Sequence, residues 1–227
     1  MQGLLYDVHG NLKALDAVLA DAGGAGVERF VLGGDYALFG PQPAETVARL
    51  RELDATWIRG NGERWTATPG EAPDDDVVQG AIGFCREALG DADVRALGEL
   101  TEQQLLDGVR YCHGSPVSDV RSFFPEPGPD EDELLDGVGE ETLVFGHTHL
   151  PFAREAAGGI LLVNPGSVGM PFDGDTGAAW AILHDDGRVE HRRVAYDHEA
   201  AAAQVRALGG GWSETVARRI ELARIDV

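Results

Sequence analysis

The chain is poor in cysteine and in positive charge. Cys85 and Cys112 are its only cysteines, and Lys13 is its only lysine. Two cysteines in 227 residues are too few for a disulfide framework, so we expect reduced thiols. Acidic residues outnumber basic ones by 39 to 18, which leaves a net charge of −21. Because such a field repels phosphate backbones and anionic lipids, we do not expect tight, non-specific binding to nucleic acids or membranes.

Long apolar runs are also absent. No apolar segment approaches about 18 residues, and the amino-terminal stretch lacks a basic region followed by a long apolar core, so nothing marks secretion or a membrane span. We therefore expect a cytoplasmic protein. With 43% hydrophobic and 25% charged residues, the chain is typical of a soluble globular protein, predicted to form a single domain over residues 1–227.

The first half of the chain alternates between apolar runs and helical periods. Strands are expected near 3–6, 28–33 and 55–59, and helices near 12–22 and 44–53, which indicates β-α-β units with parallel strands. Two stretches rich in proline, glycine and acidic residues are predicted to be exposed loops, and the other helices are expected later in the chain. The loops are 66–76 and 123–137. The helices are near 77–89, then to about 99, at 197–207 and at 213–224, and residues 130–133 suit the first turn of a short helix.

The second half contains closely spaced strand-like runs separated by short turns. "AAGG" at 156–159 and "DDG" at 185–187 are typical of hairpins, so antiparallel pairing is expected here. The whole pattern predicts two sheets packed together with helices outside.

Six apolar runs each end in a polar cluster that contains glycine. They are "LLYDVHGN" at 4–11, "RFVLGGD" at 29–35, "TWIRGN" at 56–61, "VRYCHGSP" at 109–116, "TLVFGHTH" at 142–149 and "ILLVNPGS" at 160–167. Ligands of α/β proteins bind at the carboxyl ends of the strands, so we expect these clusters to converge. Their oxygen and imidazole donors are Asp7, His9, Asp35, Asn61, His113, His147 and His149.

Each cluster has a second interpretation when it is taken alone. Asp, Asn and Gly are common turn residues, and Asn11 is well placed to cap a helix that begins at Leu12. His147 and His149 are two residues apart, so both serve one site only if the chain turns between them. Turn chemistry does not explain seven convergent donors.

Carboxylates combined with imidazoles suit Mn, Fe, Zn or Ni better than calcium, which prefers oxygen ligands alone. Seven donors exceed what one ion needs, whereas two ions about 3.5–4 Å apart that share a carboxylate and a water would use them all. A shared water of that kind attacks as hydroxide near neutral pH, and the paired cations neutralise charge on phosphoryl oxygens. The residues therefore predict a two-metal centre.

In this order, the motifs resemble those of the calcineurin-like metallophosphoesterase family, in particular its small bacterial and archaeal phosphodiesterase branch. The resemblance extends from residue 7 to residue 167. It implies an α/β fold, a four-layer αββα sandwich of two mixed β-sheets flanked by helices. It also implies a metal-dependent hydrolase of small-molecule phosphate esters, with phosphodiesters ahead of monoesters and a metal-bridging hydroxide as nucleophile. Two divalent ions are expected, with Mn²⁺ first and Fe, Zn, Ni or Mg as the other candidates.

The resemblance also implies a role for each matching residue. Asp7, His9 and His149 would bind one ion, Asn61, His113 and His147 the other, and Asp35 would bridge them. The catalytic set is then Asp35, Asn61 and His113, while Asn11, Asn61 and His113 would contact substrate. Asn11, after the "DxHGN" turn, either supports the loop or touches substrate, and "NPGS" at 164–167 is expected to be structural.

Two departures from the family pattern matter. The large protein Ser/Thr phosphatases carry "GDxVDRG" and "GNHE", whereas this chain has "GDYALFGP" and "GNGE", so a protein phosphatase is not expected. Gly62 stands where many members place the histidine that protonates the leaving group. Glu63 is a weak substitute, because a carboxyl group close to two metal ions is held ionised.

Two alternatives to a phosphodiesterase remain open. One is a phosphomonoesterase, and the other is a non-catalytic metal-binding scaffold similar to the small retromer subunit, which shares this fold. All seven metal positions are filled, which favours an enzyme over a scaffold. Substrate choice is expected to depend on the loops at 36–43, 64–76 and 117–129. The residues of these loops do not indicate a particular substrate.

Overall fold

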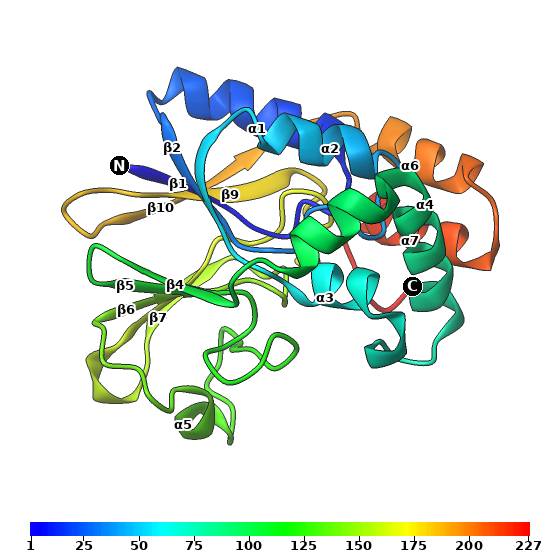
Figure 1. Ribbon diagram of the computed structural model, residues 1–227. Helices are drawn as coiled ribbons and strands as arrows, with labels where there is room; N and C mark the ends of the chain where they lie inside the picture. The colour runs from blue at the N-terminus through cyan, green and yellow to red at the C-terminus, as the bar shows by residue number, and fades with distance from the viewer.

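Two mixed five-stranded sheets pack against each other, and helices flank them (Figure 1). The computed structural model describes residues 1–227. The first sheet has the order β10-β9-β1-β2-β3 and the second has the order β4-β5-β6-β8-β7. The predicted α/β sandwich of two mixed sheets is therefore confirmed, while the prediction of a single domain stays a prediction.

The elements have the following bounds. The strands are β1 Gln2–Leu5, β2 Arg29–Leu32, β3 Asp54–Trp57, β4 Gln103–Leu106, β5 Val109–Cys112, β6 Thr142–Val144, β7 Phe152–Glu155, β8 Leu161–Asn164, β9 Ala178–Leu183 and β10 Val189–Val194. The helices are α1 Leu12–Gly24, α2 Pro43–Leu50, α3 Asn61–Ala67, α4 Asp76–Gly98, α5 Glu131–Leu134, α6 His198–Ala207 and α7 Gly211–Leu222, with 3-10 turns at Pro69–Glu71 and Ala157–Gly159.

Three apolar clusters hold the layers together. Successive side chains of a strand point to opposite faces of its sheet, so one strand contributes to two clusters. On β1, Leu5 belongs to the large cluster between the first sheet and its helices, whereas Leu4 packs between the two sheets with Tyr111 and Val144 of the second sheet. Cys112 lies in the third cluster, on the outer face of the second sheet, where it packs as a small hydrophobic residue.

The two outer layers are unequal. Figure 1 shows α1, α2, α4, α6 and α7 gathered outside the first sheet, with only the single turn of α5 beyond the second. Leu134 of α5 and Phe123 of the preceding loop cover the second sheet instead. No helix of the chain is both long and apolar enough to cross a membrane.

The second half of the chain pairs differently from the prediction. The hairpins β7–β8 and β9–β10 are confirmed as antiparallel, but β5, β6 and β8 run parallel to one another. A short turn determines only the pairing of the two strands that flank it, so the turn signals carried no information about β6 and β8.

Some other elements differ in detail from the prediction. Helix α3 and strand β4 were not expected, and residues 66–76 contain the end of α3 and a 3-10 turn. The two helices predicted between 77 and 99 are confirmed within α4, which breaks at Gly90, whose φ of 74° only glycine adopts freely.

Candidate metal centre

The seven predicted ligands converge where the carboxyl ends of strands from both sheets meet. Asp7 and His9 follow β1, Asp35 follows β2, Asn61 opens α3 after β3, His113 follows β5, and His147 and His149 follow β6. All are buried except His147, which is partly exposed. Residues as distant in the sequence as His9 and His149, which are 140 positions apart, thus supply one site.

Three of these side chains form a first cluster. Nε2 of His9 lies 3.1 Å from Nε2 of His149, and Oδ1 of Asp7 lies 3.4 Å from the latter atom. The Nδ1 atoms of the two rings donate to the carbonyl oxygens of Leu38, at 2.9 Å, and Met170, at 2.5 Å. A carbonyl only accepts, so each ring carries a proton on Nδ1, and in its neutral form each ring presents a lone pair on Nε2.

This arrangement of lone pairs is unfavourable unless a cation binds between the atoms that carry them. Two imidazole lone pairs face each other, and Oδ1 of Asp7 is buried with no hydrogen-bond partner. An unsatisfied buried acceptor costs about 1–3 kcal/mol, and more for a charged group. The donor set of the first cluster therefore fits a divalent metal ion.

Three other side chains form a second cluster. The carboxamide of Asn61 lies 2.9 Å from Nε2 of His113 and 2.9 Å from Nδ1 of His147. Nδ1 of His113 is used on the carbonyl oxygen of Gly33, at 2.8 Å, so its Nε2 also presents a lone pair. With its amide nitrogen turned inward, Asn61 donates to the rings of His113 and His147. With its oxygen turned inward, this oxygen and one nitrogen of each ring form a group of three possible metal ligands.

Two carboxylates lie between the clusters. Oδ1 of Asp35 is 3.4 Å from Nε2 of His113, and its Oδ2 is 3.9 Å from Nε2 of His9. Asp7 also belongs to both groups of candidate ligands, since its Oδ1 is 3.9 Å from Nε2 of His113. The bridging role of Asp35 stays a prediction, supported by one oxygen facing each cluster.

Backbone strain is concentrated on the predicted ligands. Eight non-glycine residues have positive φ, and five of them are Asp7 (54°), His9 (48°), Asp35 (55°), His147 (67°) and His149 (59°). Such conformations cost of order 1–3 kcal/mol each and gather at functional sites. They also supply the turn between His147 and His149 that a regular strand cannot provide, so both side chains reach the same site.

Burial and neighbouring charges set the protonation states of this site. Burial beside His149 lowers the pKa of His9 to about 4, and burial beside His113 lowers the pKa of His147 to about 4. Burial opposes the charge on Asp7, but His149 and His113 hold its pKa well below the usual value. Burial opposes a charge on His113, but Asp35 and Asp7 raise the pKa of this imidazole. Imidazoles bind metal in the neutral form, so an ion would have to displace the proton that these carboxylates favour on His113.

Comparison with known proteins agrees with this geometry. Residues 2–188 match the model of the calcineurin-like phosphoesterase superfamily domain. The chain belongs to this superfamily. Among relatives of this phosphoesterase, the Escherichia coli phosphodiesterase YfcE is 30% identical over 79% of the chain and 85% of that protein. The uncharacterized Methanocaldococcus jannaschii protein MJ0912 is 28% identical over 90% of the chain and 91% of its own.

A solved structure is similar over nearly the whole phosphoesterase. The metallophosphoesterase of Sphaerobacter thermophilus has a TM-score of 0.82 and 27% identity, and the alignment covers 98% of each chain. The family predicted from the motifs is confirmed. The superfamily depends on divalent metal ions, which agrees with the two groups of candidate ligands, and these relatives support a hydrolase.

Glu63 holds the Asp35 turn of the phosphoesterase in place. Its Oε2 accepts the backbone N–H of Asp35 at 2.9 Å and of Gly60 at 2.8 Å, and its Oε1 accepts that of Tyr36 at 2.8 Å. Burial and the nearby Asp35 raise the pKa of Glu63 to about 7, although these N–H bonds favour the ionised form. The signal in the sequence was an acidic residue three positions after Gly60, which matches the acidic half of a helix capping box.

We expect Glu63→Gln to weaken the metal centre without unfolding the protein. The amide would leave a backbone N–H group of the Asp35 turn facing another donor, and loss of a residue that orients ligands typically costs 10–100-fold in affinity or activity, so about 30-fold weaker Mn²⁺ binding is expected. Calorimetric titration with Mn²⁺ measures this, with the exposed Glu45→Gln of α2 as control. Unchanged Mn²⁺ affinity with only a lower Tm would limit Glu63 to a structural role.

Asn11 supports the site instead of facing it. Its Oδ1 accepts the N–H of Ala14 at 3.2 Å, and its Nδ2 donates to the carbonyl of Gly169 at 2.8 Å and to the hydroxyl of Tyr196 at 3.1 Å. The side chain is only 1% exposed. These contacts favour helix capping and loop support over the predicted contact with substrate, for which no amide atom remains free.

The "NPGS" segment has the structural role that was predicted. Nδ2 of Asn164 donates to the carbonyl of Gly146 at 3.1 Å, and the hydroxyl of Ser167 donates to the carbonyl of Asp7 at 2.8 Å. The segment thus ties the loop after β6 to the loop after β1.

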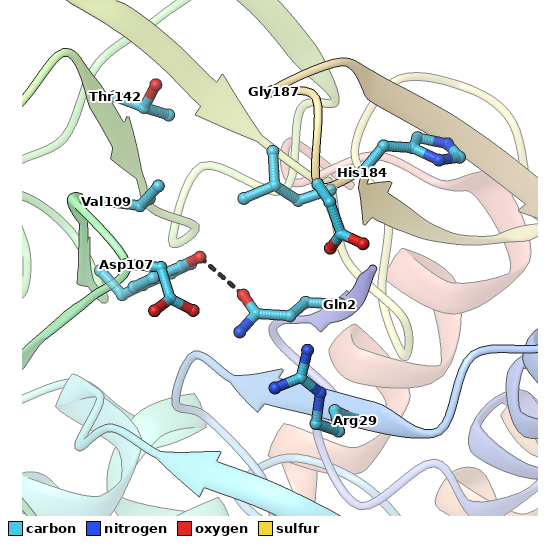
Figure 2. A pocket seen from close by; sticks show the side chains of 10 residues that line it. Gln2, Arg29, Asp107, Val109, Thr142, His184 and Gly187 are labelled. Atoms are coloured by element: carbon cyan, nitrogen blue, oxygen red, sulfur yellow. Dashed lines mark hydrogen bonds between the residues drawn. The ribbon is translucent and has the colours of Figure 1, made fainter.

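A hollow at the other end of the strands is separate from the candidate centre. Figure 2 shows this cavity, about 140 Å³ in volume, between the starting ends of β1 and β2 and those of β5 and β6. Arg29 and His184 line it, and the hydroxyl of Tyr111 donates to Gln2 at 2.9 Å. None of the predicted ligands lines it.

Proposed function

We propose that the chain is a phosphodiesterase that requires two divalent metal ions, and that Mn²⁺ gives the highest activity. The observation that carries this proposal is the buried set of unprotonated donors, in which the lone pairs of His9 and His149 face each other beside an unpartnered oxygen of Asp7. A cation bound between these atoms would satisfy all of them at once.

The proposed ligands are the two clusters, with Asp35 between them. Asp7, His9 and His149 would hold one ion, and Asn61, His113 and His147 the other. When bound, the ions would supply a hydroxide nucleophile at neutral pH and neutralise charge on the phosphoryl oxygens. Carbonyl oxygens of the backbone orient His9, His113 and His149, so little reorganisation accompanies the reaction.

Two hollows beside the centre support a diester substrate over a monoester. One, of about 440 Å³, is lined by His147, and the other, of about 370 Å³, is lined by His113. A phosphoryl group between them would place one ester substituent on each side. Asp35, Asn61 and His113 are the proposed catalytic residues, since Asp35 lies 3.4 Å from His113, which lines one hollow, and Asn61 contacts both His113 and His147.

Neither Gly62 nor Glu63 is placed to protonate the leaving group. Gly62 has no side chain, and both oxygens of Glu63 are occupied by backbone N–H groups. A general acid contributes about 10²–10⁴-fold, mostly for strongly basic leaving groups. With Mn²⁺ present, we expect kcat/KM to fall by at least about 100-fold from nitrophenyl to alkyl phosphodiesters. Measurement across a leaving-group series, with the matching monoesters alongside, tests the proposed function.

Two variants of Gly62 provide the matched control. A Cβ atom at this position would lie 2.8 Å from Oδ1 of Asp35, so any side chain displaces that carboxylate. Gly62→Ala is expected to slow all esters alike, whereas Gly62→His should also restore alkyl esters relative to aryl esters. A shallow dependence in the native protein would mean that another residue donates the proton. Faster monoester than diester cleavage would favour the phosphomonoesterase, and Mn²⁺ binding without any hydrolysis would favour the scaffold.

A further inference from the structure

The hollow beside His147 has an apolar wall. It measures about 440 Å³, within the range of about 300–1,000 Å³ that is typical of small-molecule sites. Phe124, Leu150, Phe172, Val120 and Ile225 line it together with His147. These residues come from loops that are far apart in the sequence, including the last residues of the chain.

The wall exposes apolar surface that the fold does not cover. Of the seven large hydrophobic side chains that are exposed, three open onto this hollow: Phe124 (53% exposed), Ile225 (58%) and Val120 (42%). Scattered apolar residues on a surface need no explanation, but a contiguous group beside a reactive centre marks a binding site. A ligand that covered them would gain affinity by removing this surface from water.

The charges in the wall favour an uncharged ligand group. The only guanidinium that lines the hollow belongs to Arg121, which donates to Glu133 at 2.7 Å and to Asp130 at 3.0 Å. Its charge is therefore already compensated, and the chain as a whole carries −21. A second phosphate or a carboxylate would find no free cation here.

The hollow and the metal centre share a wall. His147 lines the hollow and lies 2.9 Å from the carboxamide of Asn61 through its Nδ1. Phe172 also lines the hollow, and its ring stacks on His149 with 4.3 Å between ring centroids and 13° between ring planes. A phosphoryl group held at the centre would thus direct one of its substituents onto this apolar wall.

We propose that this hollow binds an uncharged aromatic group of the phosphate ester, such as an aryl ring or a nucleobase. The inference rests on the proposed function, because the centre must hold the phosphoryl group. Phe124 and Phe172 favour an aromatic occupant over an alkyl one, since aromatic pairs are attractive beyond the area that they bury. Phe124 is the main determinant of affinity, because it is the more exposed of the two.

Phosphonates test this inference, because each carries a single organic group and is not hydrolysed. Calorimetric titration of the Mn²⁺-loaded protein would compare methylphosphonate, cyclohexylphosphonate and phenylphosphonate. Phenylphosphonate is expected to bind about 10-fold more tightly than methylphosphonate, with cyclohexylphosphonate between them. In Phe124→Ala this preference should disappear while the affinity for methylphosphonate is unchanged. Leu105→Ala, which removes a side chain of β4 that is 58% exposed and outside the hollow, should change neither affinity.

The outcomes separate this inference from the proposed function. If methylphosphonate binds and phenylphosphonate binds no better, the aromatic site is wrong and the proposed function stands. The same holds if Phe124→Ala keeps the native preference, or if cyclohexylphosphonate binds as tightly as phenylphosphonate. Failure of all three phosphonates to bind the Mn²⁺-loaded protein would overturn the proposed function and this inference with it.

Discussion

Removal of divalent metal is expected to lower phosphodiester hydrolysis by at least about 10³-fold, since two cations supply several kcal/mol of charge stabilisation and each 1.36 kcal/mol is tenfold in rate. The buried donors at the centre include no activated nucleophile that would replace them, and Lys13, the only lysine, lies on α1. Dialysis against a chelator, followed by titration with Mn²⁺, measures the loss and the recovery. Elemental analysis of protein purified without chelator should find a transition metal.

Calcium provides the control for this experiment. It prefers all-oxygen ligand sets, so Ca²⁺ should restore little activity at a centre with four imidazoles. Mn²⁺ should also raise the Tm, because a ligand that binds only the folded state at 100 times its Kd stabilises it by about 2.7 kcal/mol. Fewer than about one ion per two chains, with no binding after incubation with Mn²⁺, would contradict the two-metal proposal.

Asp35→Asn is expected to be the most damaging single change of a ligand, with kcat/KM lowered by at least about 10³-fold. The two oxygens of Asp35 face His113 at 3.4 Å and His9 at 3.9 Å, and Oδ1 accepts the N–H of Gly62 at 2.6 Å. An amide would remove the negative charge that lies between the two clusters, so both ions would bind more weakly. Steady-state kinetics and metal stoichiometry measure the two effects.

Three other variants make this prediction specific. Asp54→Asn changes an exposed carboxylate at the start of β3 and should have no effect. Asn61→Ala should impair mainly one ion, so a variant at Asp35 that retains more activity than Asn61→Ala would contradict the bridge. Asp7→Asn belongs in the same series because Asp7 is also part of both candidate groups. If Asp7→Asn loses both ions and Asp35→Asn loses only one, the bridging ligand is Asp7 and not Asp35.

Local sequence patterns were enough to predict most elements and the membership of the candidate centre. Strand and helix positions follow from side-chain periodicity, which a segment expresses by itself. The seven predicted ligands could be found because each follows a buried strand, and the carboxyl ends of such strands meet at one edge of the sheets. The type of ligand, carboxylate or imidazole, is a property of the residue and needs no structure.

Only the tertiary structure decided the features that depend on contacts between distant segments. Asn11 donates to Gly169 and Tyr196, and Glu63 accepts from the turn at Asp35, contacts with distant segments that the motif alone does not reveal. Pairing of β5, β6 and β8 in parallel, the left-handed backbone at the ligands and the apolar wall beside His147 are likewise set by the packing of the whole chain. A local pattern cannot encode them, because each arises from the sum of long-range packing and hydrogen bonds that compensates local strain.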